Sequence, residues 1–313
     1  MRTDAVIVTG AGGPAGIAVI RDLIGRGHHV IAVDCDPLAA GLHLAHDSAV
    51  VPRFDEPGYI EELARLADKI GPCLLVSTLA EEMPSVAEAA DTLCTAGCRT
   101  WVPSAEAVRA CVDKWQFAQV LEREGIPAPV TALGTSPRVP SPWIVKPRFG
   151  RGSRDVFTAN NAADLAYALD HVDEPIVQSL VPGREFTVDA LVDRDGVLAG
   201  AVPRWRVETK AGISVKGETF AAPELVAGVD TLLRALDLTG PANVQGFASE
   251  TGAFTFIEVN PRFSGALPLS IAAGADLVGE YLRGVNGKRV RPEKLRYRSG
   301  VRMVRYFEEL ILE

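Results

Sequence analysis

The residues with the clearest chemical potential lie in residues 254–262, which end in Glu258, Asn260 and Arg262. Alternating apolar and polar residues at the start of this stretch predict a half-buried strand. Residues two apart in a strand share a face, so these three side chains are expected to point the same way. Carboxylate and amide oxygens suit Mg²⁺, and the arginine is placed to meet an anion beside the metal. The alternative is a polar strand end that forms only local salt bridges.

A second group combines a lysine with a glycine-rich loop. Lys146 lies on the predicted strand 143–147, and residues 148–154 hold two glycines, a serine and three arginines. Such a loop can fold backbone N–H groups and positive charges over phosphates. Its spacing differs from that of a P-loop, because no Gly-Lys-Ser/Thr follows. An ordinary hairpin tip is the alternative, but a lysine directly before the loop favours phosphate binding.

A third group of charges lies in residues 203–217, which include Arg204, Arg206, Lys210 and Lys216. Because the chain as a whole has a formal net charge of −8, four cations here favour an anion-binding loop over a solvated charge run. We expect Arg204 to be a catalytic cation of that loop.

The N-terminal third of the chain must position one side of any such site. Residues 5–8 predict a buried strand, residues 10–16 a glycine-rich turn before a helix to about residue 25, and residues 29–33 a second strand that ends at Asp34. This βαβ pattern resembles a dinucleotide-binding fingerprint, so an NAD site is one hypothesis. Glycines at a turn also permit close strand-to-helix packing without any ligand.

Further alternation of strands and helices up to residue 102 predicts an open parallel sheet. The turn 78–82 follows a strand and carries Glu81 and Glu82, which either position an amine substrate or, as we favour, load the next helix N-terminus. The pattern changes near residue 103, where Ser104 suits a helix N-cap. From about residue 176 the strands read as an antiparallel meander. The predicted class is therefore α/β, with α+β character in the C-terminal part.

Composition excludes several classes of protein. The acidic net charge argues against a broad nucleic-acid or membrane surface. We read no signal peptide and no apolar run long enough to span a membrane. The five cysteines are scattered, and Cys94 and Cys98 have no second pair that would complete a zinc site. A cytoplasmic protein with reduced thiols is predicted, and its oligomeric state is left open, with a homodimer as one possibility.

Taken together, these motifs resemble those of the ATP-grasp enzymes. The resemblance is to one unit of the carbamoyl-phosphate synthase large subunit and to related free-standing carboxylate–amine ligases, and it runs from about residue 4 to 290. It implies a Rossmann-like pre-ATP-grasp domain (1–103), a small lobe with a glycine-rich lid (104–182) and a large lobe with a metal site (183–313). It also implies that the N-terminal domain holds no dinucleotide.

The resemblance assigns roles to individual residues. Phosphates are expected at Lys114 of Asp113-Lys114-Trp115 and at Lys146 of Ile144-Val145-Lys146-Pro147. The lid is matched by Gly150, Gly152 and Ser153, the adenine hinge by Gln178, Ser179, Leu180 and Val181, and the ribose-binding acid by Glu185. Asn243-Val244-Gln245 and Glu258-Val259-Asn260-Pro261-Arg262 supply the metal ligands Gln245, Glu258 and Asn260, with Arg262 on the substrate or phosphoryl anion.

The implied activity is that of an ADP-forming ligase, which uses ATP and Mg²⁺ (or Mn²⁺) to join a small-molecule carboxylate to an amine through an acyl phosphate. Three features depart from close relatives: Gln178 replaces a hinge acid, only one ATP-grasp unit is present, and no glutaminase accompanies it. Three alternatives stay open. They are a kinase or carboxylase acting on a small acid, an NAD-dependent reductase built on the N-terminal domain, and a degenerate binding module.

Overall fold

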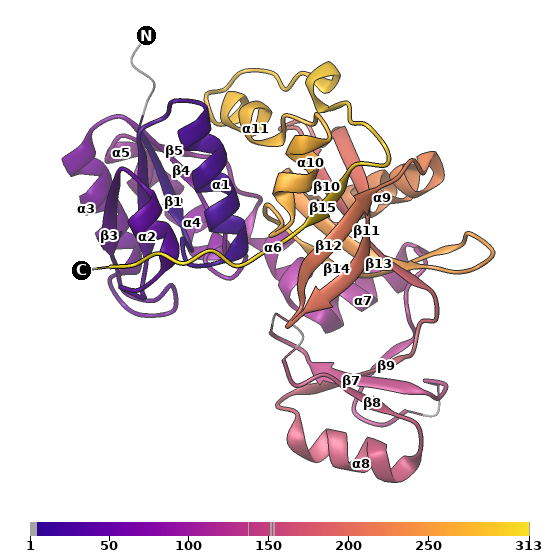
Figure 1. The fold of residues 1–313 in the computed structure, drawn as a ribbon. Helices are drawn as coiled ribbons and strands as arrows, with labels where there is room; N and C mark the ends of the chain where they lie inside the picture. Colours follow the sequence, from indigo (N-terminus) through magenta and orange to yellow (C-terminus); the bar gives the residue numbers. More distant parts are fainter. Residues whose placement is uncertain (1–4, 137, 151, 153, 313) are drawn as a thin grey trace.

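The fold is known from a computed structural model that describes residues 5–136, 138–150, 152 and 154–312 (Figure 1). Its strands form three sheets, of five, four and six strands in the described residues. The mixed α/β class predicted from the sequence is confirmed, with a parallel sheet first and antiparallel sheets after it. The boundaries at residues 103 and 182 stay a prediction. In the same described ranges, no helix has the length and apolar character needed to cross a bilayer.

The first sheet is parallel and has the order β3-β2-β1-β4-β5. Its strands are β1 (Ala5–Thr9), β2 (Val30–Asp34), β3 (Asp47–Val50), β4 (Cys73–Val76) and β5 (Cys98–Thr100). The helices are α1 (Pro14–Gly25), α2 (Ala40–Leu44), α3 (Tyr59–Ile70), α4 (Met83–Glu88) and α5 (Ala90–Thr95). The strand order reverses between β1 and β4, and ligands of such sheets bind at the carboxyl ends of strands at this kind of switch point.

The glycine-rich turn after β1 serves close packing. Pro14 occupies the first turn of α1, where its missing N–H costs no hydrogen bond. A Cβ atom at Gly16 would lie 2.3 Å from the carbonyl oxygen of Gly10. A side chain at position 16 would therefore push the helix off the strand.

Helices α6 (Ala105–Val112) and α7 (Lys114–Arg123) lead into a four-stranded antiparallel sheet of order β6-β9-β7-β8. Ser104 caps α6 as predicted, because its Oγ accepts a hydrogen bond from the Ala107 N–H at 3.1 Å. The sheet consists of β6 (Thr131–Leu133), β7 (Trp143–Pro147), β8 (Phe157–Ala159) and β9 (Pro175–Ser179), with α8 (Ala162–His171) packed on it. Its own small core contains Ala132, Val139, Val145, Ala168, Val172 and Val177.

The six-stranded sheet is antiparallel, with the order β14-β13-β10-β11-β12-β15. Its strands are β10 (Arg184–Val192), β11 (Leu198–Lys210), β12 (Ile213–Thr219), β13 (Gly240–Ala248), β14 (Phe254–Asn260) and β15 (Arg302–Val304). Helices α9 (Pro223–Ala235), α10 (Leu267–Ala272) and α11 (Leu277–Val285) and the 3-10 helix η1 (Pro292–Leu295) complete this part. Residues 203–217, predicted to be a loop, instead form most of the β11–β12 hairpin, because each cation-bearing strand finds a hydrogen-bonded partner.

The parallel sheet and the six-stranded sheet share one hydrophobic core. Val6 and Val8 of β1 belong to the same buried cluster as Leu191 of β10 and Tyr281 of α11. The rings of Trp101 and Tyr281 stack with centroids 5.5 Å apart, and the Tyr281 hydroxyl donates to the Trp101 carbonyl at 2.8 Å. This shared core fixes the carboxyl ends of β1 and β4 opposite the end of β14.

Candidate active site

The β13–β14 hairpin brings the predicted metal ligands together. In its register, Gln245 lies opposite Glu258 and Asn243 lies opposite Asn260. The Asn260 amide donates to Glu258 Oε1 at 2.7 Å. One carboxylate and neighbouring amide oxygens therefore project from adjacent strands, and such oxygens fit a hard divalent cation.

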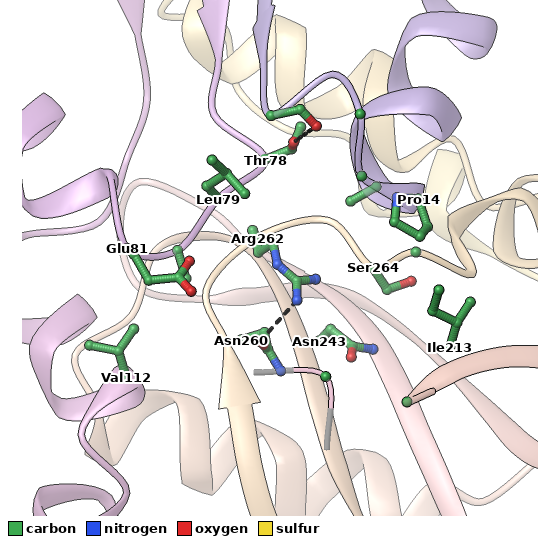
Figure 2. Close-up of a pocket in the computed structure, with 18 of the residues that line it drawn as sticks. Pro14, Thr78, Leu79, Glu81, Val112, Ile213, Asn243, Asn260, Arg262 and Ser264 are labelled. Atoms are coloured by element: carbon green, nitrogen blue, oxygen red, sulfur yellow. Dashed lines mark hydrogen bonds between the residues drawn. The ribbon is translucent and has the colours of Figure 1, made fainter. Parts of the chain in front are cut away.

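Arg262 extends this line of polar groups by one residue. Its guanidinium donates to Asn260 Oδ1 at 3.0 Å and to the Phe263 carbonyl at 2.8 Å (Figure 2). Glu258, Asn260 and Arg262 are thus linked in sequence, as their spacing predicts. The two hydrogen bonds hold the guanidinium at the end of β14.

Lys146 projects from β7 and is buried, with 8% of its surface exposed. Burial lowers its pKa to about 8, although the nearby Glu258 carboxylate opposes this shift and Lys114 adds to it. The Lys114 ammonium donates to the Gly150 carbonyl at 2.9 Å, and burial also lowers its pKa. The two predicted phosphate-binding lysines therefore lie near one carboxylate.

A cavity of about 250 Å³ separates the four-stranded sheet from the six-stranded sheet. It contains both lysines together with residues predicted for the hinge, lid, ribose and metal: Gly150, Gly152, Gln178, Ser179, Leu180, Val181, Glu185, Gln245 and Glu258. Gln178 donates to the Thr131 hydroxyl at 2.8 Å, so its side chain is held within the four-stranded sheet. Ser153 lies outside the described residues.

Glu185, the predicted ribose-binding acid, forms an ion pair with Arg206. Arg206 also donates to Gln245 Oε1 at 3.1 Å and to the Gly212 carbonyl at 2.7 Å. Burial raises the pKa of Glu185, and the arginine counteracts that rise. Arg206 therefore joins the nucleotide side of the cavity to the metal-ligand hairpin, a role that the sequence did not reveal.

Arg204, predicted to be catalytic, is 1% exposed and belongs to a buried network. Its guanidinium donates to Asp189 Oδ1 at 2.7 Å and to the Ser264 hydroxyl at 3.1 Å. The Asn243 amide donates to the same Asp189 oxygen at 3.0 Å. This geometry suits a group that positions Asn243 and Ser264, and a catalytic role for Arg204 stays a prediction.

A larger cavity, of about 1150 Å³, extends from Lys114 and Glu258 past Arg262 to the carboxyl ends of β1 and β4. Figure 2 shows its walls, which come from loops far apart in the sequence. The sequence reasoning did not single out several of its lining residues: Pro14, Thr78, Leu79, Val112, Ile213 and Ser264. Their common signal is their place after a strand or at a helix end, which only the assembled fold brings to one cavity.

Asp34, the acid of the dinucleotide-like pattern, is bound by its own loop. The N–H of Gly12 donates to Asp34 Oδ2 at 2.7 Å, and that of Asp36 donates to Oδ1 at 3.0 Å. In a dinucleotide site this carboxylate would accept ribose hydroxyls. Its use by backbone amides disfavours the NAD hypothesis.

Glu82 is fully buried and does not load the α4 N-terminus with charge, as the sequence had suggested. The hydroxyls of Thr9 and Tyr59 donate to its two oxygens. Burial raises its pKa to about 7, and these hydrogen bonds oppose the rise. The side chain therefore stabilises the loop ends of β1 and β4 from beneath the cavity.

We expect Glu82→Gln to flatten the dependence of stability on pH. A folded-state pKa above the ordinary 4.5 means that the folded chain retains a proton that the unfolded chain loses, so stability falls as pH rises from about 4.5 to about 7. At 1.36 kcal/mol per pKa unit the loss is about 3 kcal/mol. Thermal unfolding from pH 5 to 8 tests this, with Glu61→Gln on the exposed face of α3 as the control. An unchanged slope in the Glu82→Gln variant would assign the pH dependence to other groups.

Comparison with known families agrees with this geometry. Residues 111–266 match a family described as the ATP-grasp domain, and residues 9–101 match the PylC-like, N-terminal domain. This is an ATP-grasp protein. The matched ATP-grasp domain contains both lysines, the hinge residues, the β13–β14 hairpin and Arg262.

Relatives of this ATP-grasp protein include longer chains. The chain is 27% identical over 229 residues to the uncharacterized protein y4rH of Sinorhizobium fredii, a match that covers 63% of this chain and 46% of y4rH. It is 29% identical over 215 residues to the carbamoyl phosphate synthase large chain of Corynebacterium glutamicum, covering 60% of this chain and 19% of that protein. The similarity therefore spans less than half of y4rH and about a fifth of the synthase.

Solved structures share the ATP-grasp fold over almost the whole chain. The L-amino acid ligase from Bacillus licheniformis superposes with a TM-score of 0.73 at 15% identity, covering 96% of this chain and 78% of the ligase. The biotin carboxylase domain of the 2-oxoglutarate carboxylase from Hydrogenobacter thermophilus gives a TM-score of 0.74 at 16% identity, covering 95% and 73%. At such identities the similarity shows the fold alone.

Proposed function

We propose that the protein is an ADP-forming ligase that activates a small-molecule carboxylate with ATP and joins it to an amine. The supporting observation is the continuity between the two cavities. Lys114, Gly150, Gln245 and Glu258 line both the smaller cavity, with its hinge and lysines, and the larger one, which contains Arg262. A phosphate chain held between the lysines would thus meet a carboxylate held at Arg262.

ATP is proposed to occupy the smaller cavity. The adenine edge would meet the backbone of residues 178–181, the ribose would lie near Glu185, and the phosphates would lie between Lys114 and Lys146. The biotin carboxylase domain named above was crystallised with MgADP and bicarbonate, so this fold holds a nucleotide with its metal in at least one relative.

The metal proposed is Mg²⁺, or Mn²⁺ in its place. Gln245, Glu258 and Asn260 offer one carboxylate and two amide oxygens on neighbouring strands, which is a donor set for a hard cation that shares phosphate ligands. When bound, the cation would neutralise phosphate charge. The chain's own lysines and Arg262 would supply the remaining positive charge at the site.

The first chemical step proposed is phosphoryl transfer to the carboxylate. A carboxylate oxygen held by Arg262 forms a bond to the γ-phosphorus as the bond from that phosphorus to the β–γ bridging oxygen breaks, which releases ADP. The amine nitrogen then attacks the acyl carbon, inorganic phosphate leaves, and the nitrogen loses a proton to solvent or phosphate. Positioning and charge neutralisation supply most of the catalysis, so no covalent protein nucleophile is required.

Ligand-induced thermal shifts test the proposed nucleotide site. Mg·ATP at about 100 times its dissociation constant adds roughly 2.7 kcal/mol of stability, which should raise the melting temperature by several degrees. NADH and NADPH, measured in parallel, should give no shift. A shift with either nicotinamide nucleotide and none with Mg·ATP would overturn the proposal.

Release of ADP then separates ligase from kinase or carboxylase activity. A ligase requires both an acid and an amine for sustained ADP release. The carboxylase alternative predicts release with bicarbonate as the acid, and the kinase alternative predicts release with an acid alone. Sustained release without any amine would contradict the ligase proposal.

A further inference from the structure

The larger cavity has opposite charges at its two ends. Near β14 it is lined by the cations Lys114 and Arg262, and at the end of β4 it is lined by Glu81. Figure 2 shows Glu81 on the wall that faces Arg262 and Asn260, with its carboxylate turned into the cavity. The Glu81 carboxylate also counteracts the lowering of the Lys114 pKa, which places both groups in one electrostatic environment.

The other acids of the described cavity wall are engaged in the fold. Asp34 accepts from the backbone amides of Gly12 and Asp36, and Asp36 Oδ1 accepts from the Leu38 N–H at 2.9 Å. Glu258 accepts from the Asn260 amide on the metal-ligand hairpin. Glu81 differs from them in position, because it lies at the switch point of the parallel sheet, opposite the arginine proposed to hold the carboxylate.

Apolar side chains line the space between these charges. Leu79 follows β4, Val112 ends α6, and Ile213 begins β12, and all three face the cavity in Figure 2. A ligand that satisfies this wall has an anionic group, a cationic group and an apolar part in one small molecule. Pocket specificity of this kind comes from a few placed polar groups on an otherwise apolar surface.

We propose that Glu81 is a specificity-determining residue that binds the ammonium group of the activated acid, and that this acid is an amino acid with an apolar side chain. The proposal rests on the ligase function above, because it assumes that Arg262 holds the carboxylate of the same molecule. A carboxylate facing an ammonium in a partly desolvated cavity forms a charge-assisted hydrogen bond, which a neutral amide replaces poorly.

The test uses matched pairs of probes with the full-length chain and saturating Mg·ADP. The amino acids are alanine, valine, leucine and phenylalanine. Their deaminated counterparts are propionic, 3-methylbutanoic, 4-methylpentanoic and 3-phenylpropanoic acids. Calorimetric titration of wild type should give at least one amino acid that binds ten-fold or more tightly than its counterpart. Glu81→Gln should remove most of that ratio by weakening the amino acid and leaving the deaminated acid unchanged.

Asp36→Asn is the matched control, since it removes a carboxylate from the same cavity away from Arg262, and the ratio should survive there. The inference is overturned if both members of every pair bind equally to wild type, if no amino acid binds, or if Glu81→Gln keeps the ratio. The Mg·ADP titration itself distinguishes the two proposals. Binding of Mg·ADP without discrimination between acids removes only the role of Glu81, whereas no binding of Mg·ADP counts against the ligase function and this inference together.

Discussion

Replacing Lys146 with methionine is expected to raise the stability of the ligand-free protein and to abolish its response to Mg·ATP. Burial lowers the pKa of this lysine from 10.5 to about 8, so at pH 7 the folded chain carries a charge that its surroundings disfavour. The unfolded chain binds the proton more strongly, and stability therefore increases as pH rises from about 8 to 10.5. A neutral methionine of similar length removes this cost, which is about 3 kcal/mol at 1.36 kcal/mol per pKa unit.

The loss of nucleotide response follows from the same position. Lys146 lines the smaller cavity next to Lys114 and Glu258, where phosphates would offset the burial of its charge. Melting curves with and without Mg·ATP measure both effects, with the exposed Lys288→Met as the control. An unchanged Mg·ATP shift in the Lys146→Met variant would remove Lys146 from the phosphate site. A lower melting temperature without ligand would show that its aliphatic packing outweighs its charge.

Arg262→Ala is expected to spare nucleotide binding and to lower turnover by about 10² to 10³-fold, the range typical for removal of one group that stabilises transition-state charge. The structural reason is its location. Arg262 lines the larger cavity, whereas the smaller cavity, with its hinge and lysines, is formed without it. Its hydrogen bonds to Asn260 and Phe263 hold it at the end of β14, so alanine leaves the Asn260–Glu258 bond in place.

Steady-state ADP release and the Mg·ATP thermal shift measure the two properties of this variant separately. Arg262→Lys should recover part of the rate, because it keeps the charge but loses the two-pronged geometry of the guanidinium. Arg302→Ala, which removes an exposed arginine paired with Glu218, serves as the control. Equal loss of nucleotide binding and turnover in the Arg262→Ala variant would contradict a role confined to the acid and the acyl phosphate.

Local patterns were sufficient to predict part of the candidate site. Alternation in residues 254–259 and the turn before it determined the β13–β14 pairing, and hence the approach of Gln245 to Glu258. The Ser104 cap and the limits of α8 also follow from local chemistry. These features depend on neighbours a few residues apart, which sequence patterns encode directly.

Features that depend on distant partners were not predictable. Arg204 reads as a surface cation until Asp189, on the paired strand β10, is placed beside it. Glu82 reads as a helix-terminal charge until Thr9 and Tyr59 enclose it. The apolar wall of the larger cavity joins Leu79, Val112 and Ile213 from three separate parts of the chain. Tertiary contacts of this kind override the local preference of each residue.

The separate core of the four-stranded sheet has a consequence for how the molecule comes apart. The parallel and six-stranded sheets share buried residues, whereas the four-stranded sheet packs its six core residues apart from them. A unit with so small a core opens at lower free energy than the rest of the chain. Because the proposed nucleotide cavity lies between this sheet and the six-stranded sheet, a bound nucleotide would act as a cross-link. Its binding energy would merge two cooperative unfolding units into one.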